Sequence, residues 1–425
     1  MAHAELFIIL ASIFGFVMAW GVGANDVANA MGTSVGSKAL TIMQAIIIAA
    51  IFEALGSLLA GGQVTETIRG KILDTAAFTQ APDLLIYGML ASLLASGTWL
   101  IIASYFGWPV STTHTIVGAV IGFGLLARGI DAVYWEQITN IALSWIVTPI
   151  IALVIAFLLF RSVQYLIFES ETPIKNSKRY VPWYIFLVSM VLTLVTLLNG
   201  LQHIGLDLPV WESILIAIFI SLIIMLLGMI LLRRIPINHE SHERADFHKI
   251  EKIFGVLMLF TACAMAFAHG SNDVANAIGP LAAIVSIVQS GGKVLADASP
   301  IPFWIMVLGA TGIVIGLAMY GHKVIATIGN DITQLTPSRG FAAQLATAST
   351  VVIASGMGLP ISTTQTLVGA VLGVGFARGI GALNLSVIRN IFMSWIITLP
   401  AGAVLSILYY QLIEFIFSEI YILKP

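Results

Sequence analysis

The chain has 425 residues, of which 59% are hydrophobic and 9% are charged, and its formal net charge is −2 at pH 7. This composition excludes an ordinary soluble domain, and the near-neutral charge gives no reason to expect a nucleic-acid partner. Cys263 is the only cysteine, so the chain cannot form an intrachain disulfide. We therefore expect an all-α polytopic membrane protein, surrounded by a lipid bilayer.

Apolar runs recur along the whole chain. A membrane-spanning helix needs roughly 20 predominantly apolar residues to cross about 30 Å of hydrocarbon. The runs predict about twelve transmembrane helices, near residues 6–22, 40–60, 84–104, 110–127, 135–160, 181–199, 209–232, 252–268, 302–320, 341–358, 361–377 and 385–412.

The first polar motif is Gly23-Ala-Asn-Asp-Val-Ala-Asn-Ala-Met-Gly32, directly after the first apolar run. An ionisable side chain at bilayer depth costs at least ~2.5–3.5 kcal/mol, so Asp26 needs a cation, a proton or a partner. Asn25, Asp26 and Asn29 are hard oxygen ligands, and the flanking glycines predict local unwinding that frees carbonyl oxygens for a small cation. An ion pair with a buried Lys or Arg is the alternative, but the apolar runs contain almost none.

A further acidic side chain, Glu53, lies in the predicted span Ala45–Ala60. The corresponding position in the second half of the chain is Gly309, so this carboxyl group is present once. It predicts an additional cation or proton site, or else a glutamate that is satisfied by helix packing.

The motif Pro109-Val-Ser-Thr-Thr113 has the residue order of a helix start. Proline ends the preceding element, and a hydroxyl side chain caps the next helix. Such an end carries roughly half a positive charge and free backbone N–H groups, which favour an anion. Ser111, Thr112 and Thr113 are therefore candidate anion ligands, and a merely capped or kinked helix is the alternative.

Three blocks of the first half recur in the same order in the second half. The decapeptide returns as residues 270–279 with eight of ten identities, and residues 109–124 return as 360–375 with eleven of sixteen. Residues 140–148 return as 390–398. The duplication adds Asn272 and Asp273 to the cation candidates, and it adds Ser362, Thr363 and Thr364 to the anion candidates. Small-residue packing alone would explain the glycines and leave these polar residues unexplained.

The segment between the halves predicts that they are inverted. Residues 161–180 and 233–252 are basic, and they flank one pair of spans, so they lie on the same side of the membrane. The turn between these spans, residues 200–209, contains no Lys or Arg. The positive-inside rule therefore places both basic segments in the cytoplasm. With about five spans in each repeat, the two repeats have opposite topology and both termini are extracytoplasmic.

The predicted parts are a first repeat at 1–160, a connecting segment at 161–250 and an inverted second repeat at 251–425. The histidine-containing loop 238–248 is either a charged linker or a metal sensor.

Together these motifs resemble the inorganic phosphate transporter (PiT) family of sodium–phosphate symporters. The resemblance rests on the duplicated Gly-Ala-Asn-Asp-Val-Ala-Asn-Ala sequence and on the Pro-x-Ser-Thr-Thr segments in both halves. It implies an inverted-repeat transporter with broken or re-entrant helices that imports phosphate with sodium, or with protons in some bacterial members. Asn25, Asp26, Asn272 and Asp273 would then bind cations, and the two Ser-Thr-Thr groups would bind phosphate. The resemblance also implies a homodimer, and the short connection implies a prokaryotic plasma membrane.

Other functions remain open on the residues alone. A proton-coupled permease or a sulfate carrier of the same fold would use the same motifs. An anion channel would need a continuous polar path in place of paired helix starts. We expect no enzymatic activity and no catalytic residues, because no arrangement of nucleophile and base stands out.

Overall fold

The structure is a computed structural model, and it describes residues 3–106, 108, 110–198, 208–234, 243–293, 300–331, 335–379 and 385–422. These residues form thirteen α-helices, and their only β-bridge is an isolated one between Leu73 and Val133. The α-helices are α1 (Ala4–Gly36), α2 (Ile42–Ala60), α3 (Gly62–Gly70), α4 (Pro82–Phe106), α5 (Thr112–Arg128), α6 (Trp135–Val163), α7 (Pro173–Leu198), α8 (Val210–Arg233), α9 (Glu243–Gln289), α10 (Phe303–Asp331), α11 (Pro337–Gly356), α12 (Thr363–Arg378) and α13 (Leu385–Ile422). Short elements are the 3-10 helices η1 (Thr75–Phe78) and η2 (Ile130–Ala132) and the π-helix η3 (Gln164–Phe168).

The prediction of an all-α polytopic membrane protein is confirmed. Within the described ranges, nine helices are long and apolar enough to cross a membrane. Helix α8 illustrates the surface that they present, because Leu215, Phe219 and Leu227 are each more than half exposed. Large apolar side chains along a whole exposed helix face are expected in contact with lipid.

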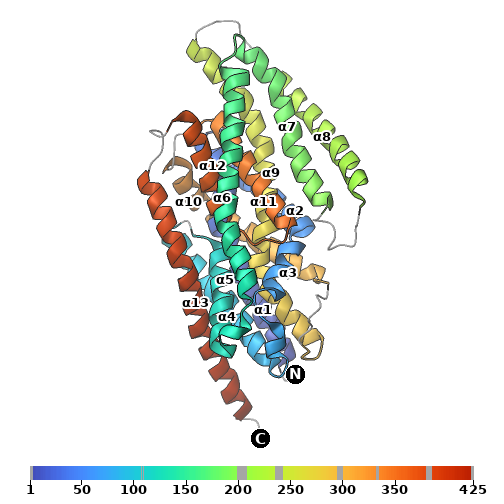
Figure 1. Ribbon diagram of the computed structural model, residues 1–425, viewed down its shortest axis with the longest axis vertical. Helices are drawn as coiled ribbons and strands as arrows, with labels where there is room; N and C mark the ends of the chain where they lie inside the picture. The colour runs from blue at the N-terminus through green and yellow to red at the C-terminus, as the bar shows by residue number, and fades with distance from the viewer. Residues whose placement is uncertain are drawn as a thin grey trace.

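Helices of each half pack against helices of the other half, and they do so in equivalent pairs (Figure 1). Helix α6 packs against α12 of the second half, and α13 packs against α5 of the first half. Likewise α1 packs against α10, and its counterpart α9 packs against α2. These pairs occur twice with the halves reversed, as two interlocked inverted repeats require. The exact division at residues 1–160, 161–250 and 251–425 stays a prediction.

The two chain ends lie at the same end of the molecule. In Figure 1 the N and C marks are at the bottom, and the connection between α6 and α7 is at the top. Helix α12 ends at Arg378, which shares a cavity with Phe160 and Gln164 at that upper end. Helix α5 ends at the opposite side, where Phe123 stacks on Tyr410 of α13. The two helices that follow the Ser-Thr-Thr motifs therefore run in opposite directions.

The expected unwinding around the Asn-Asp motifs is wrong. Helix α1 continues without a break through residues 23–32, and α9 continues through residues 270–279. The glycines instead allow close helix contacts: a Cβ atom at Gly23 would lie 2.0 Å from the carbonyl oxygen of Ile313, and one at Gly270 would lie 2.1 Å from that of Glu53. These residues bring α1 against α10 and α9 against α2, which is the packing role of small residues in membranes.

We expect Gly270→Ala to lower thermal stability strongly, because the added methyl group meets a backbone carbonyl that cannot move aside. Overpacking of this kind costs typically about 1–3 kcal/mol. Gly255, on the same helix, is the matched control, since an added Cβ atom there meets nothing within 4 Å. Gly255→Ala should stabilise the helix by roughly 0.5–1 kcal/mol. Thermal unfolding of both purified variants measures the difference, and equal midpoints would contradict the packing role.

Candidate anion and cation site

The two Ser-Thr-Thr motifs form helix starts, as predicted. Ser111 is the N-cap of α5, and its hydroxyl accepts a hydrogen bond from the backbone N–H of His114 at 3.2 Å. Ser362 is the N-cap of α12 and accepts from the N–H of Gln365 at 3.3 Å. Both helix starts lie in the interior of the protein, because the side chains of all six candidate anion ligands are buried. Pro109 lies outside the described residues.

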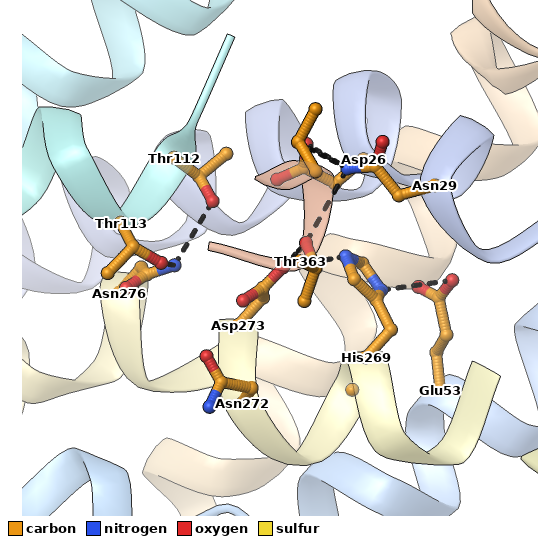
Figure 2. Close-up of polar contacts among 12 residues, drawn as sticks. Asp26, Asn29, Glu53, Thr112, Thr113, His269, Asn272, Asp273, Asn276 and Thr363 are labelled. Atoms are coloured by element: carbon orange, nitrogen blue, oxygen red, sulfur yellow. Dashed lines mark hydrogen bonds and ion pairs between the residues drawn. The ribbon is translucent and has the colours of Figure 1, made fainter. Parts of the chain in front are cut away.

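Each helix start contacts the Asn-Asp motif of the other repeat. The Nδ2 group of Asn29 donates to Thr364 Oγ1 at 2.7 Å and lies 3.5 Å from Thr363 Oγ1. In the reciprocal contact, Asn276 Nδ2 lies 3.2 Å from Thr112 Oγ1 and 3.3 Å from Thr113 Oγ1. Figure 2 shows this second contact. The fold therefore joins the predicted anion ligands of one half to the Asn-Asp motif of the other half.

The amide groups of Asn25 and Asn272, two of the predicted cation ligands, bind the segments that precede α5 and α12, and their role toward a cation stays a prediction. The Nδ2 group of Asn25 donates to Ser104 Oγ and to the carbonyl oxygen of Trp108, both at 3.2 Å. Asn272 makes the equivalent bonds to Ser355 Oγ at 2.9 Å and to the carbonyl oxygen of Leu359 at 3.2 Å. These Nδ2 groups hold the segments that precede α5 and α12, and Asn272 Oδ1 has no hydrogen-bond partner among the described residues.

The two aspartates lie close together in the interior of the protein (Figure 2). Asp26, Asp273 and His269 each offer a ligand atom within 4.8 Å of the others, and all three side chains are buried. Asp26 Oδ1 accepts from Asn29 Nδ2 at 3.0 Å, and Asp273 Oδ2 accepts from Thr363 Oγ1 at 3.0 Å. The structure therefore brings the two acidic cation candidates into one buried cluster, and their roles stay a prediction.

His269 is the residue that sequence reasoning missed. Its Nε2 atom lies 2.8 Å from Asp273 Oδ2, and its Nδ1 atom lies 3.2 Å from Glu53 Oε1. The predicted extra carboxyl group, Glu53, therefore belongs to the same cluster. One signal was present in the sequence: His269 stands four residues before Asp273 and so shares its helix face, whereas the aligned position of the first repeat is Val22.

Several buried oxygen atoms of this region have no hydrogen-bond partner among the described residues. They include both oxygens of Glu53, and four further ones are Asp26 Oδ2, Asp273 Oδ1, Asn272 Oδ1 and Asn276 Oδ1. Buried polar atoms are normally paired, so an unpaired group requires a cause such as a bound ion. These oxygens are all acceptors, so the missing partner is a cation or a hydrogen-bond donor. Carboxylate and amide oxygens are the ligands that hard cations prefer.

Positive side chains are scarce around these oxygens. Arg69 is the only buried Lys or Arg in the described part of the chain, and it lies 3.6 Å from Glu66 of its own helix α3. The alternative that Asp26 and Asp273 pair with a buried basic side chain is therefore wrong for Lys and Arg, and only His269 offers such a pair among the described residues. Of the loop 238–248, residues up to 242 lie outside the described residues, and His248 is exposed.

The sequence profile of the phosphate transporter family matches residues 22–406, which include both Asn-Asp motifs and both helix starts. The chain belongs to the phosphate transporter family. The resemblance that its motifs carry is thereby confirmed, and the family is one of transporters.

Relatives of this transporter match over almost its full length. The Haemophilus influenzae protein named "Putative phosphate permease" is 55% identical over 412 residues, which are 96% of this chain and 97% of that protein. "Inorganic phosphate transporter 2-1, chloroplastic" of Arabidopsis thaliana is 44% identical over 93% of this chain and 70% of its own length. A solved structure, "The sodium-dependent phosphate transporter", matches with a TM-score of 0.90 and 41% identity over 97% of this chain and 100% of that one.

Proposed function

We propose that this transporter imports inorganic phosphate together with sodium ions across a prokaryotic plasma membrane. The observation that carries the proposal is the set of four unpaired acceptor oxygens beside two helix starts that face each other across the repeats. The helix starts favour an anion and the oxygens favour a cation. The solved relative at 41% identity is described as sodium-dependent.

In this proposal each motif has one task. Thr112, Thr113, Thr363 and Thr364, with the N-caps Ser111 and Ser362, bind phosphate through hydroxyl and backbone N–H donors. Asp26 and Asp273 bind sodium, and the oxygens of Asn25 and Asn272 complete its ligands. The hydroxyl of Thr113 already donates to the carbonyl oxygen of Ile361 at 2.9 Å, so the two helix starts touch directly. The proposed phosphate site and the proposed sodium site would therefore lie next to each other.

Sodium binding explains how an anion can approach two carboxylates. Two negative groups at this depth repel phosphate unless positive charge lies between them. The described surroundings provide no buried Lys or Arg for that purpose, since Arg69 lies beside Glu66. A bound cation would supply the charge only when it is present, and this dependence would couple the two substrates.

Uptake of labelled phosphate into proteoliposomes tests the proposal. We expect accumulation when sodium is higher outside than inside, and little uptake when choline replaces sodium. Sulfate at the same concentration serves as the competing oxyanion. Sodium-independent uptake that follows the phosphate gradient alone would contradict coupling and would favour a channel.

A proton-coupled carrier is the second candidate, and His269 favours it. Its imidazole lies between Asp273 Oδ2, at 2.8 Å, and Glu53 Oε1, at 3.2 Å, and it can carry a proton between these two carboxyl groups. Uptake driven by a pH gradient in sodium-free buffer would support this candidate and would contradict sodium coupling.

A double substitution tests whether Glu53 and His269 act as one unit. We expect Glu53→Leu and His269→Leu each to lower uptake and thermal stability, because each leaves the other buried polar group without this partner. Such a loss costs about 1–3 kcal/mol, whereas removing both partners is far milder. The double variant should therefore lose less than the sum of the single losses. Strictly additive losses in uptake and in melting temperature would show that the contact is unimportant.

The orientation in the membrane is also a proposal. We infer that the α6–α7 connection is cytoplasmic and that both termini are extracytoplasmic, as the basic segments predict. Lys175 and Ser418 are exposed at the two ends. In a background without Cys263, a cysteine at Lys175 should react with an impermeant maleimide only from the cytoplasmic side, and one at Ser418 only from outside. Labelling from the same side would contradict the inverted arrangement. The homodimer stays a prediction.

A further inference from the structure

We propose that the groove between α7 and α8, at the end of the molecule that carries the basic connections, binds an anionic phospholipid. The groove contains a cavity of about 510 Å³. Its lining residues are Lys178, Arg179, Pro182, Trp183, Met225, Met229, Leu232 and Arg233. Helices α7 and α8 lie side by side on one flank of the molecule, and the anion and cation site uses neither of them (Figure 1).

The charge of the groove is complementary to a phosphate headgroup. Three of its lining residues are basic, and among those described none is acidic. A second cavity at the same end, of about 350 Å³, provides the contrast: it contains Arg339 and Arg378 but also Glu169 and Glu251. Basic side chains between membrane helices at the cytoplasmic surface are recognised elements of lipid headgroup sites. Of these two cavities, the α7–α8 groove is the one with a net positive lining.

The register of the two helices separates the groove into a charged mouth and an apolar floor. Gly228 contacts Ile185, where an added Cβ atom would lie 2.4 Å from Ile185 Cδ1, so α7 and α8 touch at this level. From Gly228 to Arg233 the helix rises about 7–8 Å, and the basic residues of α7 lie at the same end. Lys178, Arg179 and Arg233 therefore form the mouth.

The floor favours a lipid over a free anion. Met225, Met229 and Leu232 supply flexible apolar side chains, and Trp183 is 61% exposed at the rim. Tryptophan is enriched at the level of lipid headgroups, and methionine adapts to irregular apolar ligands. A free phosphate ion would use the mouth alone, whereas a phospholipid would fill both parts. The groove is thus matched to a headgroup with the first part of an acyl chain.

Native mass spectrometry of the purified full chain in a neutral detergent tests the proposal. The probes are phosphatidylglycerol and phosphatidylcholine with identical acyl chains. We expect phosphatidylglycerol to bind more tightly, and we expect the triple variant Lys178→Gln, Arg179→Gln, Arg233→Gln to lose this preference. Each basic side chain contributes roughly fivefold near an anionic lipid, so the triple variant should lose affinity by a factor on the order of one hundred. An unchanged preference would overturn the proposal.

Two further variants distinguish a defined lipid site from a general attraction between lipid and basic surface. A control triple variant at Arg161, Lys175 and Lys252, which lie at the same end but outside the cavity, removes the same charge and should retain the preference. An equal loss in the control would overturn the proposal. Met229→Trp should fill the floor and weaken phosphatidylglycerol binding with no change in charge. Displacement of the lipid by inorganic phosphate would assign the mouth to a free anion instead. Labelled-phosphate uptake by each variant confirms that the fold is intact.

Discussion

Asp26→Asn and Asp273→Asn should each abolish sodium-driven phosphate uptake while leaving a folded, monodisperse protein. Asparagine keeps the shape of the side chain and an oxygen that can accept the present bonds from Asn29 to residue 26 and from Thr363 to residue 273. It removes only the negative charge. Loss of one partner from a buried ion pair costs roughly 3–5 kcal/mol, which is a loss of more than about a hundredfold in cation affinity.

The matched control for this prediction is Asp131→Asn. Asp131 is exposed in η2 and undergoes the same chemical change, so its uptake should equal that of the unaltered chain. Initial rates in proteoliposomes and the elution profile of the purified protein are the two measurements. A variant at position 26 or 273 that transports normally would remove that carboxylate from the mechanism. A variant that aggregates would show instead that the charge serves the fold.

Phosphate should bind poorly without sodium and much more tightly when sodium saturates the site. The donors at the two helix starts are neutral, while Asp26 and Asp273 lie beside the hydroxyl groups and amides that contact them. Without cations these carboxylates oppose the anion. Coupling free energies between two sites are typically about 1–3 kcal/mol, which corresponds to roughly 5–150-fold in affinity.

Isothermal titration of the purified protein measures this coupling, with choline replacing sodium at constant ionic strength. Thermodynamic linkage requires that phosphate raise sodium affinity by the same factor as sodium raises phosphate affinity. The reciprocal titration is therefore an internal control. Phosphate affinity that is independent of sodium would contradict the roles of both aspartates. The same dependence on pH in place of sodium would move the coupling to protons and to His269.

Features that depend on near neighbours in the chain could be predicted from the sequence. A membrane environment follows from composition, because apolar runs of sufficient length are incompatible with water. The helix starts at Ser111 and Ser362 follow from the chemistry of proline and hydroxyl side chains over five residues, and the structure confirms both caps. The duplication and the family are likewise properties of residue order, and they identify Asp26 and Asp273 as a pair.

Contacts between distant segments needed the tertiary structure. The glycines of the Asn-Asp motifs illustrate the reason. A glycine permits either local unwinding of a helix or close packing of two helices. Close packing occurs here because the backbone of Ile313 or Glu53 lies against the glycine, and only the tertiary structure shows this contact. The bond from Asn29 to Thr364 joins residues 335 positions apart, so no local pattern contains it. His269 is similar, because a lone histidine in an apolar helix acquires a role only when α2 places Glu53 beside it. Local chemistry determined which residues are candidate ion ligands, and packing between the two repeats decided which of them meet.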